Sequence, residues 1–292
     1  MKNAFQGKYV IITGASLGLG KAIAEKLAAK GCNLILLSLP NENLSHCCED
    51  IATKYGIDTL YYEMDLREED NIREFAEWVM AQEVEIAGLV NNAGIGGSSF
   101  FDRTDVMNID NMILINIRAL TLMTRLFVPE LKKREKAFVL NVSSIAAFKP
   151  MPYKTVYPAS KAFVYSFSVG LGEELKDSPV HVAVLHPGPM DTSAENAGRI
   201  SKHGFLGKLV HLSVDEVAGI GVQQLFAGKK VIVPGVFNKL CIRLLKSIPR
   251  DLAMPILTKV LKKEAYKIPQ KSLSPVTQTQ HIHPAQRKAA NS

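Results

Sequence analysis

Residues 8–31 read KYVIITGASLGLGKAIAEKLAAKG, and this stretch decides the fold class. An apolar, β-rich run leads into a loop that contains Gly14, Gly18 and Gly20, and a helical pattern follows until Gly31, a typical C′ residue. Glycines at a strand end let the backbone turn tightly and approach a pyrophosphate, whose charge then faces free N–H groups at a helix N-terminus. The stretch therefore predicts a strand–turn–helix unit that can bind a dinucleotide.

The same alternation of apolar runs with helical patterns continues over the first two-thirds of the chain. Strands are predicted over 8–13, 33–38, 58–63, 86–91, 137–143, 180–186 and 230–233. Helices are predicted over 20–30, 42–54, 69–82, 105–134, 155–176 and 213–227. Nearly continuous apolar strands that alternate with helices indicate a parallel sheet covered on both faces. We predict an α/β fold: one Rossmann-type, doubly wound domain with a seven-stranded parallel sheet flanked by helices.

The composition excludes several classes of protein. Of 292 residues, 47% are hydrophobic and 22% charged, which excludes a wholly disordered chain and a collagen-like repeat. The first residues, MKNAFQ, lack the apolar region of a secretory signal, and no apolar run reaches the roughly 18–20 residues of a membrane-spanning helix.

The four cysteines do not have the spacing of a zinc site; they are Cys32, Cys47, Cys48 and Cys241. We therefore expect reduced thiols, no metal and a cytoplasmic location. We expect Cys47 and Cys48 to divide between a helix surface and the core.

A polar segment, Asn91-Asn92-Ala93-Gly94, follows the fourth predicted strand. In an open parallel sheet, ligands bind beyond the carboxyl ends of the strands, where the strand order reverses. Small residues at that place leave room for a nucleotide. Taken alone the segment is equally compatible with a simple polar turn, so its position in the sheet carries the prediction.

Residues 157–161, YPASK, place a phenol and an ammonium four residues apart. Side chains with this spacing lie one turn apart on the same helix face, and Pro158 suits the first turn. A phenol with a pKa of about 10 is a poor proton donor or acceptor at neutral pH. We expect the ammonium of Lys161 to favour the phenolate and to lower the pKa of Tyr157. Ser144, thirteen residues earlier, ends the fifth predicted strand.

The glycine loop, the segment at 91–94, Ser144 and the pair Tyr157 and Lys161 follow one another in the order and spacing typical of the short-chain dehydrogenase/reductase family. The chain resembles this family over about residues 7–235. A further match is the segment HPGPMDT at 186–192. The resemblance implies hydride transfer between a nicotinamide and a carbonyl carbon. Tyr157 would exchange a proton with the substrate oxygen, and Ser144 would polarise that oxygen. Lys161 would tune Tyr157 and bind the nicotinamide ribose, while Asn116 would hold a water that links Lys161 to solvent.

The resemblance also implies how the cofactor is held. It assigns the adenine contact to Asp65 and places Thr192 near the nicotinamide carboxamide. The full expected set is Gly14, Ser16, Gly18, Leu19, Gly20, Ser38, Asp65, Leu66, Asn92, Ala93, Gly94, Tyr157, Lys161, Pro187, Gly188 and Thr192. Two near matches are set aside. Tyr153 has no lysine four residues later, so we interpret it as a residue of the cleft wall. Ser143 precedes Ser144, but the spacing to Tyr157 favours Ser144 as the catalytic serine.

The preferred dinucleotide depends on the end of the second predicted strand. In the family an acid there contacts the adenosine ribose of NAD, and basic residues there or in the glycine loop hold a 2′-phosphate. In this chain Ser38 occupies the usual position of the acid, and Leu39 occupies the usual position of an arginine. The glycine loop also lacks its extra basic residue, because Leu17 precedes Gly18. With no carboxylate at that position, we expect Ser16, Ser38 and Asn41 to accept the phosphate. The sequence thus favours NADP(H) over NAD(H).

Positive charge is concentrated near the C-terminus. The formal net charge is +7, and residues 228–268 contain ten Lys or Arg against Asp251 and Glu264. A basic amphipathic helix is predicted by apolar residues at helical spacing with basic residues between them. These are Phe237, Leu240, Cys241, Leu244, Leu245 and Ile248, with Lys239, Arg243, Lys246 and Arg250. The helix either packs on the domain or a second subunit, or lies on an anionic membrane or over a cleft for a lipid-like substrate. No pattern typical of nucleic-acid binding is present.

We predict three parts: a catalytic domain over 1–235, a basic helical extension over 236–268 and a flexible tail over 269–292. The extension resembles that of a family branch that handles hydrophobic ketones, sterols and long acyl chains. The residues that match are Val233-Pro234-Gly235, Asn238-Lys239 and Pro249-Arg250. An apolar pocket is expected from the loop at about 190–212 together with Phe100, Phe101, Phe148, Met151 and Met190.

The predicted function is interconversion of a ketone and a secondary alcohol on a hydrophobic substrate, either a 3-oxoacyl chain, a long-chain ketobase or a steroid. Two alternatives stay open. One is a non-catalytic dinucleotide-binding redox sensor or scaffold, and the other is a peripheral membrane protein. We expect a homodimer or homotetramer through the helices at 105–134 and 155–176, as is usual in the family.

Overall fold

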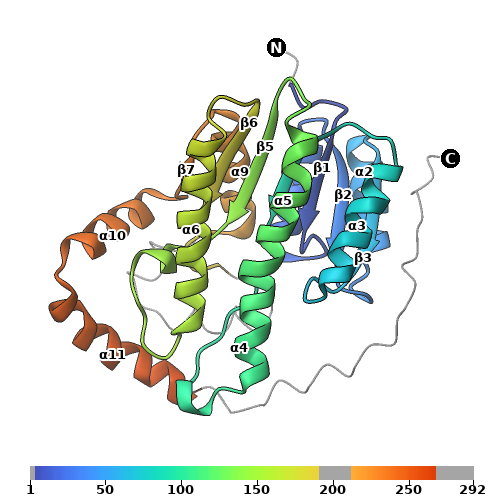
Figure 1. Ribbon diagram of the computed structural model, residues 1–292. Helices are drawn as coiled ribbons and strands as arrows, with labels where there is room; N and C mark the ends of the chain where they lie inside the picture. Colours follow the sequence, from blue (N-terminus) through green and yellow to red (C-terminus); the bar gives the residue numbers. More distant parts are fainter. Residues whose placement is uncertain (1–3, 191–211, 268–292) are drawn as a thin grey trace.

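The computed structural model describes residues 4–190 and 212–267 (Figure 1). Its centre is a parallel seven-stranded sheet in the order β3-β2-β1-β4-β5-β6-β7. The strands are β1 (Tyr9–Thr13), β2 (Asn33–Ser38), β3 (Thr59–Glu63), β4 (Ile86–Asn91), β5 (Ala137–Val142), β6 (Val180–Leu185) and β7 (Val231–Ile232). The chain moves outward from β1 to β3 and then returns to place β4 beside β1. The strand order therefore reverses between β1 and β4, as in a doubly wound fold, and the predicted fold class is confirmed.

Helices cover both faces of the sheet (Figure 1). They are α1 (Gly18–Ala28), α2 (Leu44–Tyr55), α3 (Glu69–Ala81), α4 (Val106–Ile113), α5 (Leu120–Leu131), α6 (Val156–Glu174), α9 (Val214–Phe226), α10 (Val236–Ser247) and α11 (Arg250–Lys267). Short turns of 3₁₀-helix are η1 (Phe101–Arg103) and η3 (Ile145–Phe148). Each of the predicted strands and core helices is present, with ends shifted by a few residues.

The strands divide the core into two halves because successive side chains point to opposite faces. In β1, Val10 and Ile12 pack toward α1, α2 and α9, whereas Tyr9 and Ile11 pack toward α3 and α5. Both faces of the strand are buried, which explains its nearly uninterrupted apolar sequence.

The helix predicted over 105–134 forms but is not regular. A π-helical segment, η2 (Leu114–Ala119), lies between α4 and α5 without a break in the helix. The continuous stretch Val106–Leu131 is long and apolar enough to cross a membrane by length and composition alone. In the structure Met123, Phe127 and Leu131 of this stretch are buried against the sheet.

Helix ends carry two local features, one of them the predicted C′ glycine, and one expectation about the cysteines is wrong. The hydroxyl of Ser213 accepts a hydrogen bond from the Glu216 amide (3.2 Å), and the Glu216 carboxylate accepts one from the Ser213 amide (2.8 Å), which forms a capping box. Gly31 has φ +78° after α1. The expectation that Cys47 or Cys48 faces solvent is wrong, because α2 packs both thiols into the core.

The C-terminal extension differs from the prediction in its number of helices. It contains two helices, α10 and α11, instead of one, and they extend away from the sheet in Figure 1. The side of α10 that faces the domain carries Asn238 and Ile242, while Phe237, Leu240 and Leu244 are exposed. Asn238 packs beside Gly188 of the catalytic domain, and its side chain also donates a hydrogen bond to the Pro234 carbonyl (2.9 Å) at the start of α10. The tail predicted over 269–292 lies outside the described residues.

Candidate active site

The glycine loop between β1 and α1 has the backbone that a phosphate site requires. Gly14 and Gly18 have φ values of +65° and +59°, which favour glycine. A Cβ on Gly20 would lie 1.9 Å from the Gly14 carbonyl oxygen, so only glycine lets α1 pack this closely. Leu17 is the N-cap of α1, and no side chain caps the helix there. The first amides of α1 are therefore left for an anionic ligand, and the loop fits the pyrophosphate of a dinucleotide.

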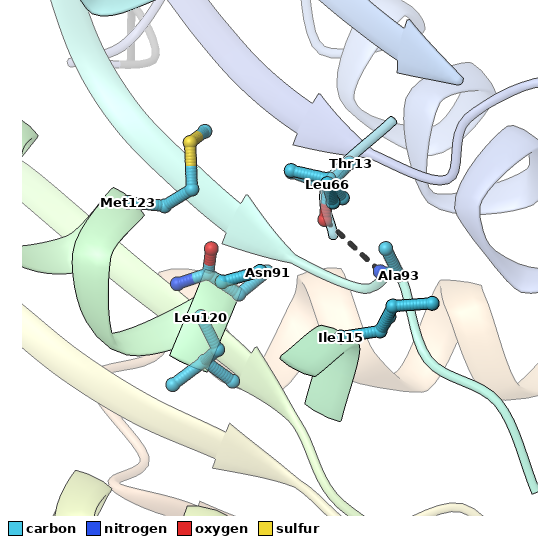
Figure 2. Close-up of a pocket in the computed structure, with 8 residues that line it drawn as sticks. Thr13, Leu66, Asn91, Ala93, Ile115, Leu120 and Met123 are labelled. Atoms are coloured by element: carbon cyan, nitrogen blue, oxygen red, sulfur yellow. Dashed lines mark hydrogen bonds between the residues drawn. The ribbon is translucent and has the colours of Figure 1, made fainter. Parts of the chain in front are cut away.

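The segment after β4 is bound to this loop through Thr13. The Thr13 hydroxyl accepts hydrogen bonds from the Asn92 amide (3.0 Å) and the Ala93 amide (2.9 Å), and Figure 2 shows the second of these. The Asn92 side chain donates to the carbonyls of Thr13 (2.9 Å) and Gly14 (3.0 Å). The segment at 91–94 is thus a partner of the glycine loop and not a simple polar turn.

A small cavity lies where the strand order reverses (Figure 2). Its volume of about 10 Å³ is roughly the space of one water molecule. Its lining comes from β1, β4 and the segment that follows it, η2, α5 and the residue after Asp65: Thr13, Leu66, Asn91, Ala93, Ile115, Ala119, Leu120 and Met123. The structure thus brings Leu66 and Ala93, both expected near the cofactor, to the same place.

A buried row of polar side chains, which the sequence analysis missed, supports this edge of the sheet. The Asn91 side chain donates to the side chains of Thr124 (2.9 Å) and Asn141 (2.8 Å). Asn141 in turn donates to the Ser168 hydroxyl of α6 (2.9 Å). Asparagine inside two apolar strands is the signal that could have revealed the row, because a buried amide requires partners.

Ser144 and Tyr157 lie together at the carboxyl end of β5. The Ser144 hydroxyl accepts a hydrogen bond from the Ala146 amide (3.1 Å), which fixes it at the start of η3. Burial raises the pKa of Tyr157 above its usual value of 10.0, and a hydrogen bond with Ser144 partly opposes this rise. The expectation that the pKa of Tyr157 is lowered is therefore wrong in this structure, since burial outweighs the effect of its partners.

Lys161 is buried one turn after Tyr157 on α6. Its Nζ lies 5.9 Å from the centroid of the Tyr157 ring and donates to the Val142 carbonyl oxygen (3.1 Å). Burial lowers the pKa of Lys161 from 10.5 to about 8. The side chain can therefore take up or release a proton near neutral pH.

Asn116 lies in the π-helical segment and faces the same site. Its side-chain oxygen accepts from the Ile95 amide (2.9 Å), and its nitrogen donates to the Ile95 carbonyl (2.9 Å) and to the Ser160 hydroxyl (3.0 Å). Gly94 lies between Asn116 and Lys161, because a Cβ there would be 3.1 Å from the Asn116 oxygen and 3.0 Å from Lys161 Nζ. Asn116 thus holds the chain after β4 against Lys161.

The two near matches have other partners. The Ser143 hydroxyl is buried and donates to the Lys161 carbonyl oxygen (2.8 Å), so it supports α6. Tyr153 stacks edge-on against Phe100, with 5.0 Å between ring centroids, and its carbonyl accepts from the Ser99 amide (2.8 Å). These contacts agree with the choice of Ser144 and Tyr157 as the reactive pair.

The adenosine end contains a carboxylate that the sequence analysis did not place. The Ser16 hydroxyl donates a 2.6 Å hydrogen bond to the Glu42 carboxylate, which reaches the glycine loop from the turn before α2. Ser38 is buried and donates to the Leu39 carbonyl (3.0 Å). Burial raises the pKa of Glu63, and the charge of Glu42 raises it further. The sequence analysis considered only the strand end and the glycine loop, whereas this acid comes from the turn after the strand.

Asp65 follows β3 as expected, but its carboxylate is bound within the chain. It accepts hydrogen bonds from the Arg67 amide (2.9 Å) and from the Arg67 guanidinium (2.8 Å at Nε). Its carbonyl oxygen accepts from the Asn71 side chain (3.1 Å). Asp65 thus shapes the turn beside the expected adenine position.

The segment at 186–192 closes the other end. The Pro187 carbonyl accepts from the Ile145 amide (3.0 Å), next to Ser144. A Cβ on Gly188 would lie 2.7 Å from Asn238 Nδ2, so α10 is packed directly against this segment. Thr192 and most of the loop at about 190–212 lie outside the described residues.

The expected apolar pocket is not assembled by the described residues. The Phe148 ring packs on Tyr165 and His186, with ring centroids 5.3 and 4.6 Å apart. Phe101 is exposed, and Met190 packs against the core. These aromatic and methionine side chains support separate parts of the fold.

This geometry agrees with a comparison of the sequence with known families. Residues 8–202 match the family model described as short chain dehydrogenase. The chain belongs to this family. Among its relatives, the very-long-chain 3-oxoacyl-CoA reductase of Anas platyrhynchos is 38% identical over 203 residues, which are 68% of this chain and 64% of the relative. The 17-beta-hydroxysteroid dehydrogenase type 3 of Mus musculus is 36% identical over 189 residues, 64% of this chain and 61% of the relative.

Solved short-chain dehydrogenase structures share the fold. A metagenomic short-chain oxidoreductase in complex with NADP is 26% identical with a TM-score of 0.66, and the match covers 80% of this chain and all (100%) of the other. A Burkholderia phymatum enzyme in complex with NAD is 22% identical with a TM-score of 0.72, and covers 83% and 94%. The chain thus belongs to a family of oxidoreductases with a nucleotide cofactor. It spans less than two-thirds of the length of the curated relatives named above.

Proposed function

We propose that this short-chain dehydrogenase interconverts a ketone and a secondary alcohol with a nicotinamide dinucleotide. The observation that carries the proposal is the convergence of Ser144, Tyr157 and Lys161. The hydroxyl and the phenol are hydrogen-bonded, and the buried ammonium lies beside Gly94, in the segment that Asn92 binds to the glycine loop. The dinucleotide, when bound, supplies or accepts the hydride.

The proton transfer falls to Tyr157. Its raised pKa keeps the phenol protonated at neutral pH, which suits the donor that neutralises a developing alkoxide during reduction. Ser144 is held at the start of η3, and its hydroxyl can donate to the same substrate oxygen. The two groups together favour charge on the oxygen as the carbonyl is reduced.

Lys161 and Asn116 act behind the phenol. Because the pKa of Lys161 is about 8, its side chain can return a proton to the site after Tyr157 has donated one. Asn116 fixes the backbone at Ile95 and keeps Gly94 against Lys161 Nζ. We assign the ribose contact of the nicotinamide half to Lys161, since its Nζ lies at the glycine surface after β4.

We propose a hydrophobic substrate, with a 3-oxoacyl chain first and a steroid or long-chain ketobase as alternatives. Support comes from the relatives named as a very-long-chain 3-oxoacyl-CoA reductase and a 17-beta-hydroxysteroid dehydrogenase. It also comes from the exposed apolar side chains of α10, a helix that packs beside Gly188.

For the cofactor, the sequence favours NADP(H), but the contacts at the adenosine end support NAD(H). The Glu42 carboxylate bonded to Ser16 would repel a 2′-phosphate, whereas a free 2′-hydroxyl could donate to it. A second carboxylate, Glu63, adds to the negative potential. We therefore propose NAD(H) as the preferred dinucleotide, and fluorescence titrations with NADH and NADPH test this. Tighter binding of NADPH would contradict it.

The reaction is tested with Tyr157→Phe, which removes only the phenolic oxygen. We expect oxidation of reduced dinucleotide by 3-oxoacyl and steroid ketones to fall by at least about a hundredfold, because the proton donor is lost. Dinucleotide binding, measured by fluorescence, should stay within about twofold. The matched control is Tyr153→Phe, which should retain turnover. Equal turnover of Tyr157→Phe and the parent would overturn the assignment, and tight dinucleotide binding with no turnover of any ketone would favour the redox sensor.

A further inference from the structure

We propose that α10 docks the protein on an anionic membrane surface. Its outward face carries Val236, Leu240 and Leu244, which are 79%, 59% and 60% exposed, with Phe237 beside them. We call these four side chains the apolar stripe of α10. Residues four apart lie on one side of a helix, so the stripe is continuous over the length of α10.

The stripe faces away from the domain because other residues make the domain contact. Asn238, 1% exposed, and Ile242, 7% exposed, hold α10 against the catalytic part. In a helix that only covers its own domain, the apolar residues would face inward and the polar ones outward. Here a buried asparagine occupies the inner face while leucines remain outside, which marks a surface for an apolar partner.

The charge next to the stripe identifies the partner as an anionic lipid surface. Lys239 and Arg243 are exposed along one edge of the stripe, and α10 contains no acidic residue. An apolar face edged by basic side chains matches acyl chains below negative headgroups. A second copy of this chain would bring the same positive edge and be repelled, so the charge favours membrane over self-association. Leu252 of α11, 65% exposed, adds a further apolar side chain after the stripe.

Two contacts connect α10, which carries the stripe, to the proposed substrate side of the candidate active site. Lys149, after η3, donates from Nζ to the Ile248 carbonyl (3.0 Å) at the end of α10. Asn238 fills the space beside Gly188. Docking would therefore place the segments that follow Ser144 and His186 next to the lipid surface. A hydrophobic ketone could then reach the site from the membrane without crossing water.

The test is co-sedimentation of the full chain with vesicles, without dinucleotide or substrate, so that it is independent of the proposed reaction. Vesicles of phosphatidylcholine alone are compared with vesicles that also contain phosphatidylglycerol. We expect binding to the anionic vesicles, and a fall of at least about tenfold in Leu240→Ser/Leu244→Ser and in Lys239→Glu/Arg243→Glu. The matched control, Lys132→Glu/Lys136→Glu, changes the net charge equally on an exposed site elsewhere and should bind like the parent.

Each other outcome would overturn the proposal. Equal binding of parent and both α10 variants would show that the stripe is not the contact. Equal loss in the Lys132→Glu/Lys136→Glu control would show that only net charge matters. A change in oligomeric mass of Leu240→Ser/Leu244→Ser by light scattering, without a change in vesicle binding, would show that a second copy covers the stripe. Unchanged dinucleotide binding in each variant confirms that it is folded.

Discussion

The two ends of the candidate cleft are built differently. At the nicotinamide end, Ser144, Tyr157 and Lys161 come from a strand end and one helix, and their positions are fixed by buried hydrogen bonds. At the adenosine end, Glu42 reaches Ser16 from a turn and accepts a hydrogen bond from its hydroxyl. Under the proposed function, the reaction groups thus lie on or next to regular elements, whereas the proposed determinant of dinucleotide selectivity lies on a turn.

This difference has a physical cause. Proton transfer requires groups within hydrogen-bond distance of one oxygen atom, so small displacements of these groups lower the reaction rate strongly. Discrimination of a 2′-phosphate acts through charge over a longer range and tolerates a less rigid group. We expect substitutions at the nicotinamide end to change rate and those at the adenosine end to change selectivity.

The largest effect should come from Ser144→Ala. Loss of the hydroxyl removes a donor to the substrate oxygen, so kcat should fall about 10²- to 10³-fold with little change in dinucleotide affinity. Steady-state kinetics and fluorescence titration measure the two quantities. The control, Ser143→Ala, removes the bond to the Lys161 carbonyl and should lower stability by about 1 kcal/mol while kcat is largely retained. A similar loss of kcat in both variants would remove the distinction between the serines.

The second effect concerns Lys161 and pH. Burial lowers its pKa to about 8 in the folded state, against an ordinary value of 10.5, so the unfolded chain binds the extra proton between these values. The free energy of unfolding should therefore rise with pH over this window, by about 3 kcal/mol in total, relative to Lys161→Met. Urea unfolding of both proteins from pH 7 to 10.5 measures the difference. Parallel curves would show that the folded and unfolded pKa values are equal.

The smallest effect should be at Glu42. Glu42→Gln removes the charge but keeps the shape, so affinity for NADPH should rise about tenfold while that for NADH changes little. Glu49→Gln, on the exposed side of α2, is the charge-matched control. Titrations with both reduced dinucleotides give the ratio. An unchanged ratio would place selectivity at another residue of this end.

The same contrast explains what could be predicted from the sequence. Strands such as 33–38 are buried on both faces, so their apolar runs define the sheet. The spacing of Tyr157 and Lys161 fixes them on one helix face. No spacing rule connects Glu42 to Ser16, because a turn whose Asn41 and Asn43 have positive φ brings them together. Which face of α10 meets the domain was left open, because the pattern of leucines does not reveal that Asn238 lies on the inner side.

The π-helical segment at 114–119 has a consequence for how this chain can change by insertion and deletion. A π-turn holds one residue more than an α-helical turn, and each residue turns the helix by about 100°. Deletion of one residue there would give a more regular helix, yet it would rotate Asn116 relative to the side chains by which α5 packs on the sheet, such as Phe127. The protein therefore keeps a locally less stable backbone, and a shorter, better helix would come at the expense of the site.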